Sequence, residues 1–171
     1  MTTRALVLGS GGLTGAAWLA GMLAGIAESG VDVRTADRII GTSAGALVGA
    51  RLAAGESTAE LDQWARTTVP PAATLPGVAL ARLLAAQVAP SRQQAVRWLG
   101  RVSGAAAAMP QEQWRAYLDA ALSGIEAWPE RLSVVCVACD TGLPQVFTRD
   151  ADVPLPLAVA ASCAMPGIFP R

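Results

Sequence analysis

Residues 37–55 read DRIIGTSAGALVGARLAAG, and this stretch decides the fold. Its first four residues, Asp37–Ile40, predict a short strand. The glycines and serine of residues 41–45 predict a tight turn. The small residues from Ala46 to Ala54 predict a helix, which Gly55 ends.

The chain begins with a unit of the same kind. Arg4–Leu8 is a short apolar run typical of a buried parallel strand, and a turn with four glycines in seven residues follows it at 9–15. Apolar residues at helical spacing then predict a helix from Ala16 to Ser29, with Gly30 as its cap. Two successive strand–turn–helix units predict a parallel α/β sheet, which places both glycine turns at the carboxyl edge of the strands.

The remainder of the chain divides into a helical middle and a β-rich end. Ser57 and Glu60 form a capping box, and the helical texture that follows predicts a helical insertion at about 57–130. Within the insertion we predict helices near 78–88, 92–102 and 111–122. Beyond it we predict a strand at 132–138, a paired strand at 144–148 and a short helix at 155–164.

The composition excludes several classes of protein. Thirteen basic and thirteen acidic residues give zero net charge, which argues against a nucleic-acid partner. The chain has no His and no Lys, so it lacks the base of a Ser-His-Asp triad, a Schiff-base amine and a P-loop lysine. Any general base must be Asp or Glu. We expect no cofactor.

The three cysteines and the apolar amino-terminal run bear on location. The three cysteines, Cys136, Cys139 and Cys163, are few and odd in number, unlike the cysteines of a disulfide framework. With no His and no second CxxC, we expect no metal. The uncharged run Ala5–Ala27 has the length of a signal or anchor, but the glycines at 9–15 divide it into blocks too short to cross lipid. We therefore expect a cytoplasmic protein that can contact a membrane surface transiently.

The turn Gly41-Thr42-Ser43-Ala44-Gly45 has the pattern of a nucleophile elbow. Between a strand and a helix, this pattern exposes a serine hydroxyl and directs the positive end of the helix toward developing negative charge. Ser43 is thus the candidate nucleophile. The alternative is an ordinary tight turn in a chain with 17 glycines.

The first glycine turn can supply oxyanion donors, because backbone N–H groups in an open glycine loop bind anions. Gly11 and Gly12 are the candidates. The alternative is a nucleotide-binding module that uses Gly9–Gly15, with Asp32 or Asp37 as the ribose-binding acid. Against it, Thr14 stands where the GxGxxG fingerprint needs its last glycine.

Three segments together resemble the patatin-like phospholipases, a family of serine acyl hydrolases. Residues 10–15 resemble the family's glycine loop, with Ser10 in place of a glycine and Thr14 in place of an arginine. The elbow serine corresponds to Ser43, and residues 161–170 resemble the segment before the last catalytic motif. The resemblance implies a three-layer α/β/α fold with a mainly parallel sheet, in one domain over 1–171.

The resemblance also implies a Ser-Asp dyad that cleaves lipid or phospholipid acyl esters through an acyl-enzyme. The family's Asp-Gly motif would follow Pro170, and no Asp-Gly dipeptide occurs in the chain. We therefore expect a truncated chain that is inactive alone, with Asp140, Asp150 and Asp152 as fallback bases. A non-catalytic remnant stays open as an alternative.

Four tryptophans in the helical middle bear on the substrate. They could line an acyl pocket or touch a membrane surface, although their helical spacing favours a role in the core. They are Trp64, Trp98, Trp114 and Trp128. The sequence does not indicate an oligomeric state.

Overall fold

The structure, a computed structural model, describes residues 3–68, 76–102 and 108–170. Its centre is a four-stranded sheet with the order β1-β2-β3-β4. The strands are β1 (Ala5–Leu8), β2 (Arg38–Gly41), β3 (Leu132–Val137) and β4 (Pro144–Phe147). The first three are parallel and β4 runs antiparallel to β3, which confirms the predicted α/β class and mainly parallel sheet.

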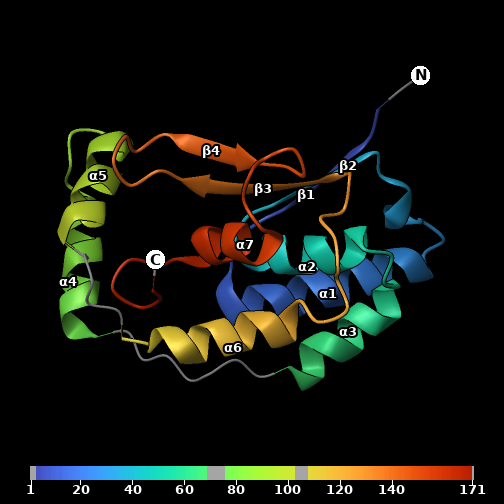
Figure 1. The fold of residues 1–171 in the computed structure, drawn as a ribbon. Coiled ribbons are helices and arrows are strands. Elements are labelled where there is room, and N and C mark those ends of the chain that lie inside the picture. Colours follow the sequence, from blue (N-terminus) through green and yellow to red (C-terminus); the bar gives the residue numbers. More distant parts are fainter. Residues whose placement is uncertain (1–2, 69–75, 103–107, 171) are drawn as a thin grey trace.

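The helices follow the predicted pattern closely. Their bounds are α1 Gly12–Glu28, α2 Ala44–Ala53, α3 Thr58–Thr67, α4 Gly77–Ala86, α5 Arg92–Val102, α6 Gln111–Ala121 and α7 Leu155–Cys163, with a short 3-10 helix at Val33–Thr35. In Figure 1, α4 and α5 stand at the end of the sheet near the β3–β4 turn.

The start of α1 differs from the prediction. The helix begins at Gly12 rather than Ala16, because the Gly15 N–H already donates to the Gly11 carbonyl at 2.9 Å and closes a helical turn. Half of the predicted glycine loop is therefore the first turn of the helix. The sequence did not reveal this, because glycine is a poor helix former and reads as a turn residue.

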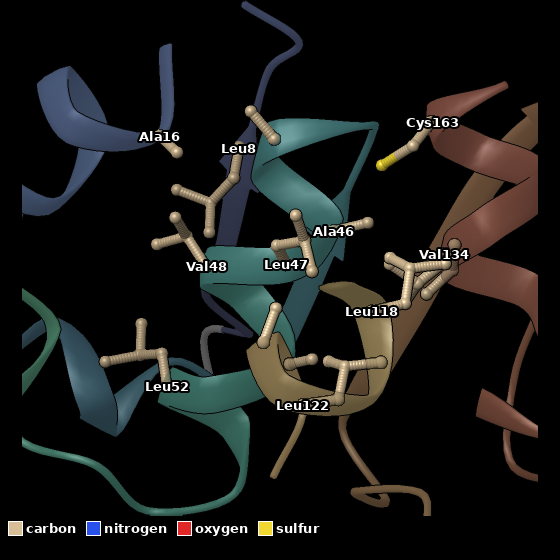
Figure 2. Close-up of a cluster of buried hydrophobic side chains, with 14 of the residues drawn as sticks. Leu8, Ala16, Ala46, Leu47, Val48, Leu52, Leu118, Leu122, Val134 and Cys163 are labelled. Atoms are coloured by element: carbon tan, nitrogen blue, oxygen red, sulfur yellow. The ribbon is translucent and has the colours of Figure 1, made fainter. Parts of the chain in front are cut away.

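Helix α2 is the centre of the core. Eight of its ten residues are buried, and it packs against β1, β2 and β3. Small residues allow this approach: a Cβ on Gly49 would lie 3.1 Å from the Ile39 side chain. Figure 2 shows Val48 and Leu52 of α2 with Leu8 of β1, and Leu118 and other side chains closing the same cluster.

Three helices cover one face of the sheet. Figure 1 shows α1, α2 and α7 on the same side of the strands. On the other face Val7 and Val146 are 69% and 56% exposed. Within the described ranges the protein thus has two of the three layers that the resemblance implies.

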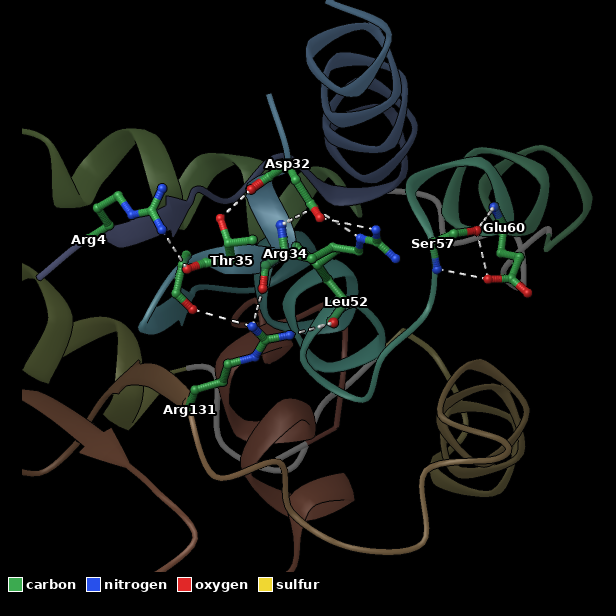
Figure 3. Close-up of polar contacts among 9 residues, drawn as sticks. Arg4, Asp32, Arg34, Thr35, Leu52, Ser57, Glu60 and Arg131 are labelled. Carbon is green, nitrogen blue, oxygen red and sulfur yellow. Dashed lines mark hydrogen bonds and ion pairs between the residues drawn. The ribbon is translucent and has the colours of Figure 1, made fainter. Parts of the chain in front are cut away.

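Polar contacts fix the segments that join these layers (Figure 3). The Arg131 guanidinium donates to the carbonyls of Arg34, Ala36 and Leu52, which ties the start of β3 to the 3-10 helix and to the end of α2. At α3 the Ser57 N–H donates to the Glu60 carboxylate at 2.7 Å, and the Glu60 N–H donates to the Ser57 hydroxyl at 3.2 Å. The predicted capping box is therefore confirmed.

Candidate active site

Ser43 occupies a sharp turn between β2 and α2. Its φ of 55° and ψ of −118° make it the single non-glycine residue with positive φ among the described residues. A backbone in this region costs on the order of 1–3 kcal/mol and persists only where its surroundings enforce it. The side chain is half-buried at the carboxyl edge of the sheet.

The two glycines of the turn are required by close backbone approach. A Cβ on Gly45 would come within 3.0 Å of the backbone of Leu8 and Gly9, and a Cβ on Gly41 would meet the backbone of Gly45 and Ala46 in the same way. Neither clash could be relieved by side-chain rotation. The predicted elbow glycines, Gly41 and Gly45, therefore let α2 start directly against β1.

The two glycine turns lie side by side, as predicted. The Gly45 N–H donates to the Gly9 carbonyl at 3.1 Å. A Cβ added to Gly15 would lie 3.7 Å from the Ala44 Cβ, which is ordinary contact distance. Helices α1 and α2 consequently begin next to each other at the carboxyl edge of the sheet. Both present the positive end of their dipole there.

Gly11 and Gly12 stand at the start of α1 and are exposed. Gly11 is the N-cap residue and Gly12 has a φ of 58°. The first N–H groups of a helix have no acceptor within the helix, so those at this end are available to an anion. Backbone N–H groups of this kind are the donors that an oxyanion site uses.

The end of α7 contacts the elbow from the other side. The Ser43 N–H donates to the Ser162 hydroxyl at 2.8 Å, although the two residues are 119 positions apart. Cys163 is buried, and Figure 2 shows its sulfur directed toward the start of α2. Burial raises the pKa of the Cys163 thiol to about 11, while a hydrogen bond with the Ser43 side chain acts in the opposite direction. Sequence reasoning noticed this segment as a motif but not these contacts.

Comparison with known families decides the classification. The chain matches the family described as patatin-like phospholipase over residues 6–171. The chain belongs to this family. Among solved structures this patatin-like chain is similar to the type III effector protein ExoU, with 20% sequence identity and a TM-score of 0.53. The likeness shows a shared fold.

The two proteins differ in extent. The alignment covers 97% of this patatin-like chain but 41% of the ExoU chain. No curated protein matches the chain.

Among the described residues, no hydrogen bond joins Ser43 to any of the three candidate fallback bases. Asp140 is exposed in the β3–β4 turn, where its carboxylate accepts a hydrogen bond from the Thr141 N–H at 2.8 Å. Asp150 and Asp152 are exposed in the β4–α7 loop. Asp150 borders a hollow with Arg38 at the amino-terminal edge of the sheet, opposite the elbow.

The structure also separates the acids of the nucleotide-binding alternative from the glycine turn. Asp37 precedes β2, where its carboxylate accepts from the Arg4 N–H at 2.8 Å. Asp32 forms an ion pair with Arg34 at 3.0 Å in the 3-10 segment. A ribose-binding acid belongs about 20 residues after the glycine loop and contacts a ligand that lies beyond the carboxyl ends of the strands. Both acids lie toward the opposite edge.

Cys136 and Cys139 are close in sequence but lie in different local structures. Cys136 lies in β3, whereas Cys139 follows the end of the strand, and both are free thiols. Burial, and secondarily Cys139, raises the pKa of Cys136. In the described ranges no group of three or more His, Cys, Asp and Glu side chains could hold a metal ion.

A groove of about 620 Å³ lies between α6, α7 and the end of β3. Trp114, Leu118, Val137, Leu157 and Ala160 are among its lining residues, so its surface is mainly apolar. Its volume falls within the range of small-molecule sites.

The predicted tryptophans have different roles. Trp114 is 6% exposed, lines the groove and stacks on Phe169 with ring centroids 4.4 Å apart. Trp64 lies beneath the Arg51 guanidinium at 4.9 Å, and the Trp128 ring N–H donates to the Leu132 carbonyl at 3.1 Å. Trp114 therefore borders the groove, and Trp98 borders a separate hollow beside α4 and α5.

Proposed function

We propose that this protein is a serine acyl hydrolase that cleaves acyl esters of lipids or phospholipids, with Ser43 as its nucleophile. The observation that carries the proposal is the backbone of Ser43, strained at φ 55° beside a second glycine turn. Such strain in a non-glycine residue points to function. A turn that needed no reactive side chain could have glycine at this position, which adopts positive φ without strain. Membership in the patatin-like phospholipase family supports the same chemistry.

In the proposed reaction the Ser43 oxygen forms a bond to the ester carbonyl carbon, and its proton passes to a base. The carbonyl oxygen becomes an oxyanion, which the N–H groups of Gly11 and Gly12 stabilise together with the adjacent helix starts. The ester C–O bond then breaks, and the alcohol leaves with the proton. Water attacks the acyl-enzyme by the same route, releasing the carboxylic acid and restoring Ser43.

We propose an aspartate as the base, at the position after Pro170 that the family resemblance implies. An unperturbed aspartate has a pKa of about 3.9 and is a weak base toward an alcohol. Burial beside apolar side chains raises such a pKa. Oxyanion donors worth roughly 3–4 kcal/mol each in other enzymes supply much of the remaining stabilisation.

The groove between α6 and α7 is our candidate for the acyl chain. Its apolar lining suits a hydrocarbon, and Ala161 and Ala164 of its wall flank the two residues that contact Ser43. We further propose a cytoplasmic protein that meets its substrate at a membrane surface. None of the helices in the described part of the chain is long and apolar enough to cross a bilayer.

Covalent labelling tests the proposal. The protein expressed from its complete reading frame is treated with a fluorophosphonate probe, and the modified residue is identified by peptide mass spectrometry. We expect labelling at Ser43, none in Ser43→Ala, and unchanged labelling in Ser133→Ala, a control on β3. No labelling together with thermal stabilisation by NAD or FAD would support the nucleotide-binding alternative. No labelling and no such stabilisation would support a non-catalytic remnant.

A further inference from the structure

The β2–β3 ladder ends where the elbow begins. The Ile39 N–H donates to the Arg131 carbonyl at 2.8 Å, and the register continues through Gly41 opposite Val134. Alternate carbonyls of a strand point to the same side, so the Val135 carbonyl, like that of Arg131, faces β2. In a straight continuation of β2 its partner would be the N–H of Ser43.

The turn at Ser43 prevents this direct pairing, and one side chain fills the gap. The Ser162 hydroxyl donates to the Val135 carbonyl at 2.6 Å and accepts from the Ser43 N–H at 2.8 Å. Neither partner leaves a choice of direction, because a carbonyl can only accept and an amide N–H can only donate. The Ser162 hydroxyl thus bridges β2 and β3 at the position where the direct backbone hydrogen bond is missing.

We propose that Ser162 is a positioning residue for the nucleophile. Its hydroxyl holds Ser43 in the strained turn by bridging the Ser43 N–H and the Val135 carbonyl, which a regular β-ladder would join directly. The inference rests on the proposed function of Ser43. The bridge satisfies an amide that the turn withdraws from β3, and it fixes the elbow to both β3 and α7. It also occupies the Ser43 N–H, so that this group is not a donor to the oxyanion, in agreement with a role for the separate glycine turn.

Substitutions at Ser162 separate the bridge from general stability. Ser162→Ala removes the acceptor of Ser43 and the donor to Val135, whereas Ser162→Thr keeps a hydroxyl. The matched control is Ser57→Ala, because the Ser57 hydroxyl also donates one hydrogen bond and accepts one, but at the start of α3. If Ser162→Ala does not fold, Ser162→Cys provides a weaker and longer bridge for the same comparison.

Two measurements test the proposal. The first is hydrogen exchange of the Ser43 amide, followed by NMR of 15N-labelled protein expressed from the complete reading frame. The second is the rate of fluorophosphonate labelling at Ser43. In Ser162→Ala we expect exchange about tenfold faster and labelling about 10- to 100-fold slower. Ser162→Thr should restore both, and Ser57→Ala should change neither.

The two measurements distinguish failure of this inference from failure of the proposed function. If Ser162→Ala gives the same Ser43 exchange and labelling as Ser57→Ala, the positioning role is refuted. If the wild-type protein is not labelled but its Ser43 amide exchanges faster in Ser162→Ala alone, the bridge is supported and the hydrolase proposal fails. If Ser162→Thr restores neither measurement, the hydroxyl is not the responsible group and the inference is overturned.

Discussion

Replacing Gly45 by alanine tests whether α2 must begin against β1. The added Cβ would lie less than 3.0 Å from three backbone atoms, the carbonyl carbon and oxygen of Leu8 and the oxygen of Gly9. Backbone atoms cannot rotate away, so either β1 or α2 must shift, and α2 is mostly buried. We therefore place the cost at the upper end of the range for overpacking, about 3 kcal/mol. In a chain of this length that corresponds to a fall in Tm of about 6–12 °C.

Urea denaturation followed by tryptophan fluorescence measures this effect, with Gly21→Ala as the control. Gly21 is exposed within α1, and a Cβ there meets nothing within 4 Å, so alanine should stabilise the protein by about 0.5–1 kcal/mol. The two Gly→Ala changes should thus have opposite signs. If Gly45→Ala unfolds at the same urea concentration as the wild type, the close approach of the two turns does not hold.

Further predictions concern the elbow, its surroundings and the polar frame. Ser43→Gly should be about 1 kcal/mol more stable than Ser43→Ala in the same assay, because glycine adopts positive φ without strain. Burial raises the Cys163 pKa from 9.0 to about 11. The neutral thiol therefore stabilises the fold below pH 9, and this contribution is lost as the pH rises to about 11. The fall in Tm at alkaline pH should consequently be shallower in Cys163→Ala. Arg131→Met should cost about 2–3 kcal/mol in urea titrations through the loss of charged hydrogen bonds. Arg66→Ala, which removes an exposed ion pair, should leave the urea midpoint unchanged. The 171 residues alone should hydrolyse a p-nitrophenyl acyl ester negligibly, because the Asp140 carboxylate accepts a hydrogen bond within the β3–β4 turn and Asp150 borders the amino-terminal edge of the sheet. Appreciable turnover that Ser43→Ala abolishes would contradict this.

Local sequence patterns predicted much of the fold. Apolar runs and glycine punctuation placed β1, β2, α2 and α7 within one or two residues of their observed bounds. The capping box at Ser57 and the glycine cap at Gly30, which has a φ of 89°, were also readable. These features depend on neighbouring residues, so the sequence contains the information directly.

Periodicity alone was less reliable on α1. Its spacing groups Trp18 and Met22 with Leu19 and Leu23, yet Trp18 is 62% exposed and Leu23 is 3% exposed. The helix packs on α2 and α3 through its small and leucine residues. Which part of a broad apolar stripe is buried depends on the neighbours, and one helix sequence does not contain that information.

The candidate site was predictable in part for the same reason. The strand–turn–helix context identified Ser43, Gly41 and Gly45, and parallel topology predicted that Gly11 and Gly12 share their edge of the sheet. The contact of Ser43 with Ser162 joins residues 119 positions apart through a break in a β-ladder. No local pattern encodes such a pairing, so it emerged only from the three-dimensional arrangement.

The strand order has a consequence for where catalysis can be built. Passing from β1 to β3, the chain winds in one direction, and right-handed crossovers then deliver their helices to a single face. A parallel strand joined to the outer side of β1 would have to reverse the winding and would carry its helix to the bare face. Open α/β sheets hold their ligands at such a point of reversal, and here it would lie at the carboxyl end of β1, where the two glycine turns meet.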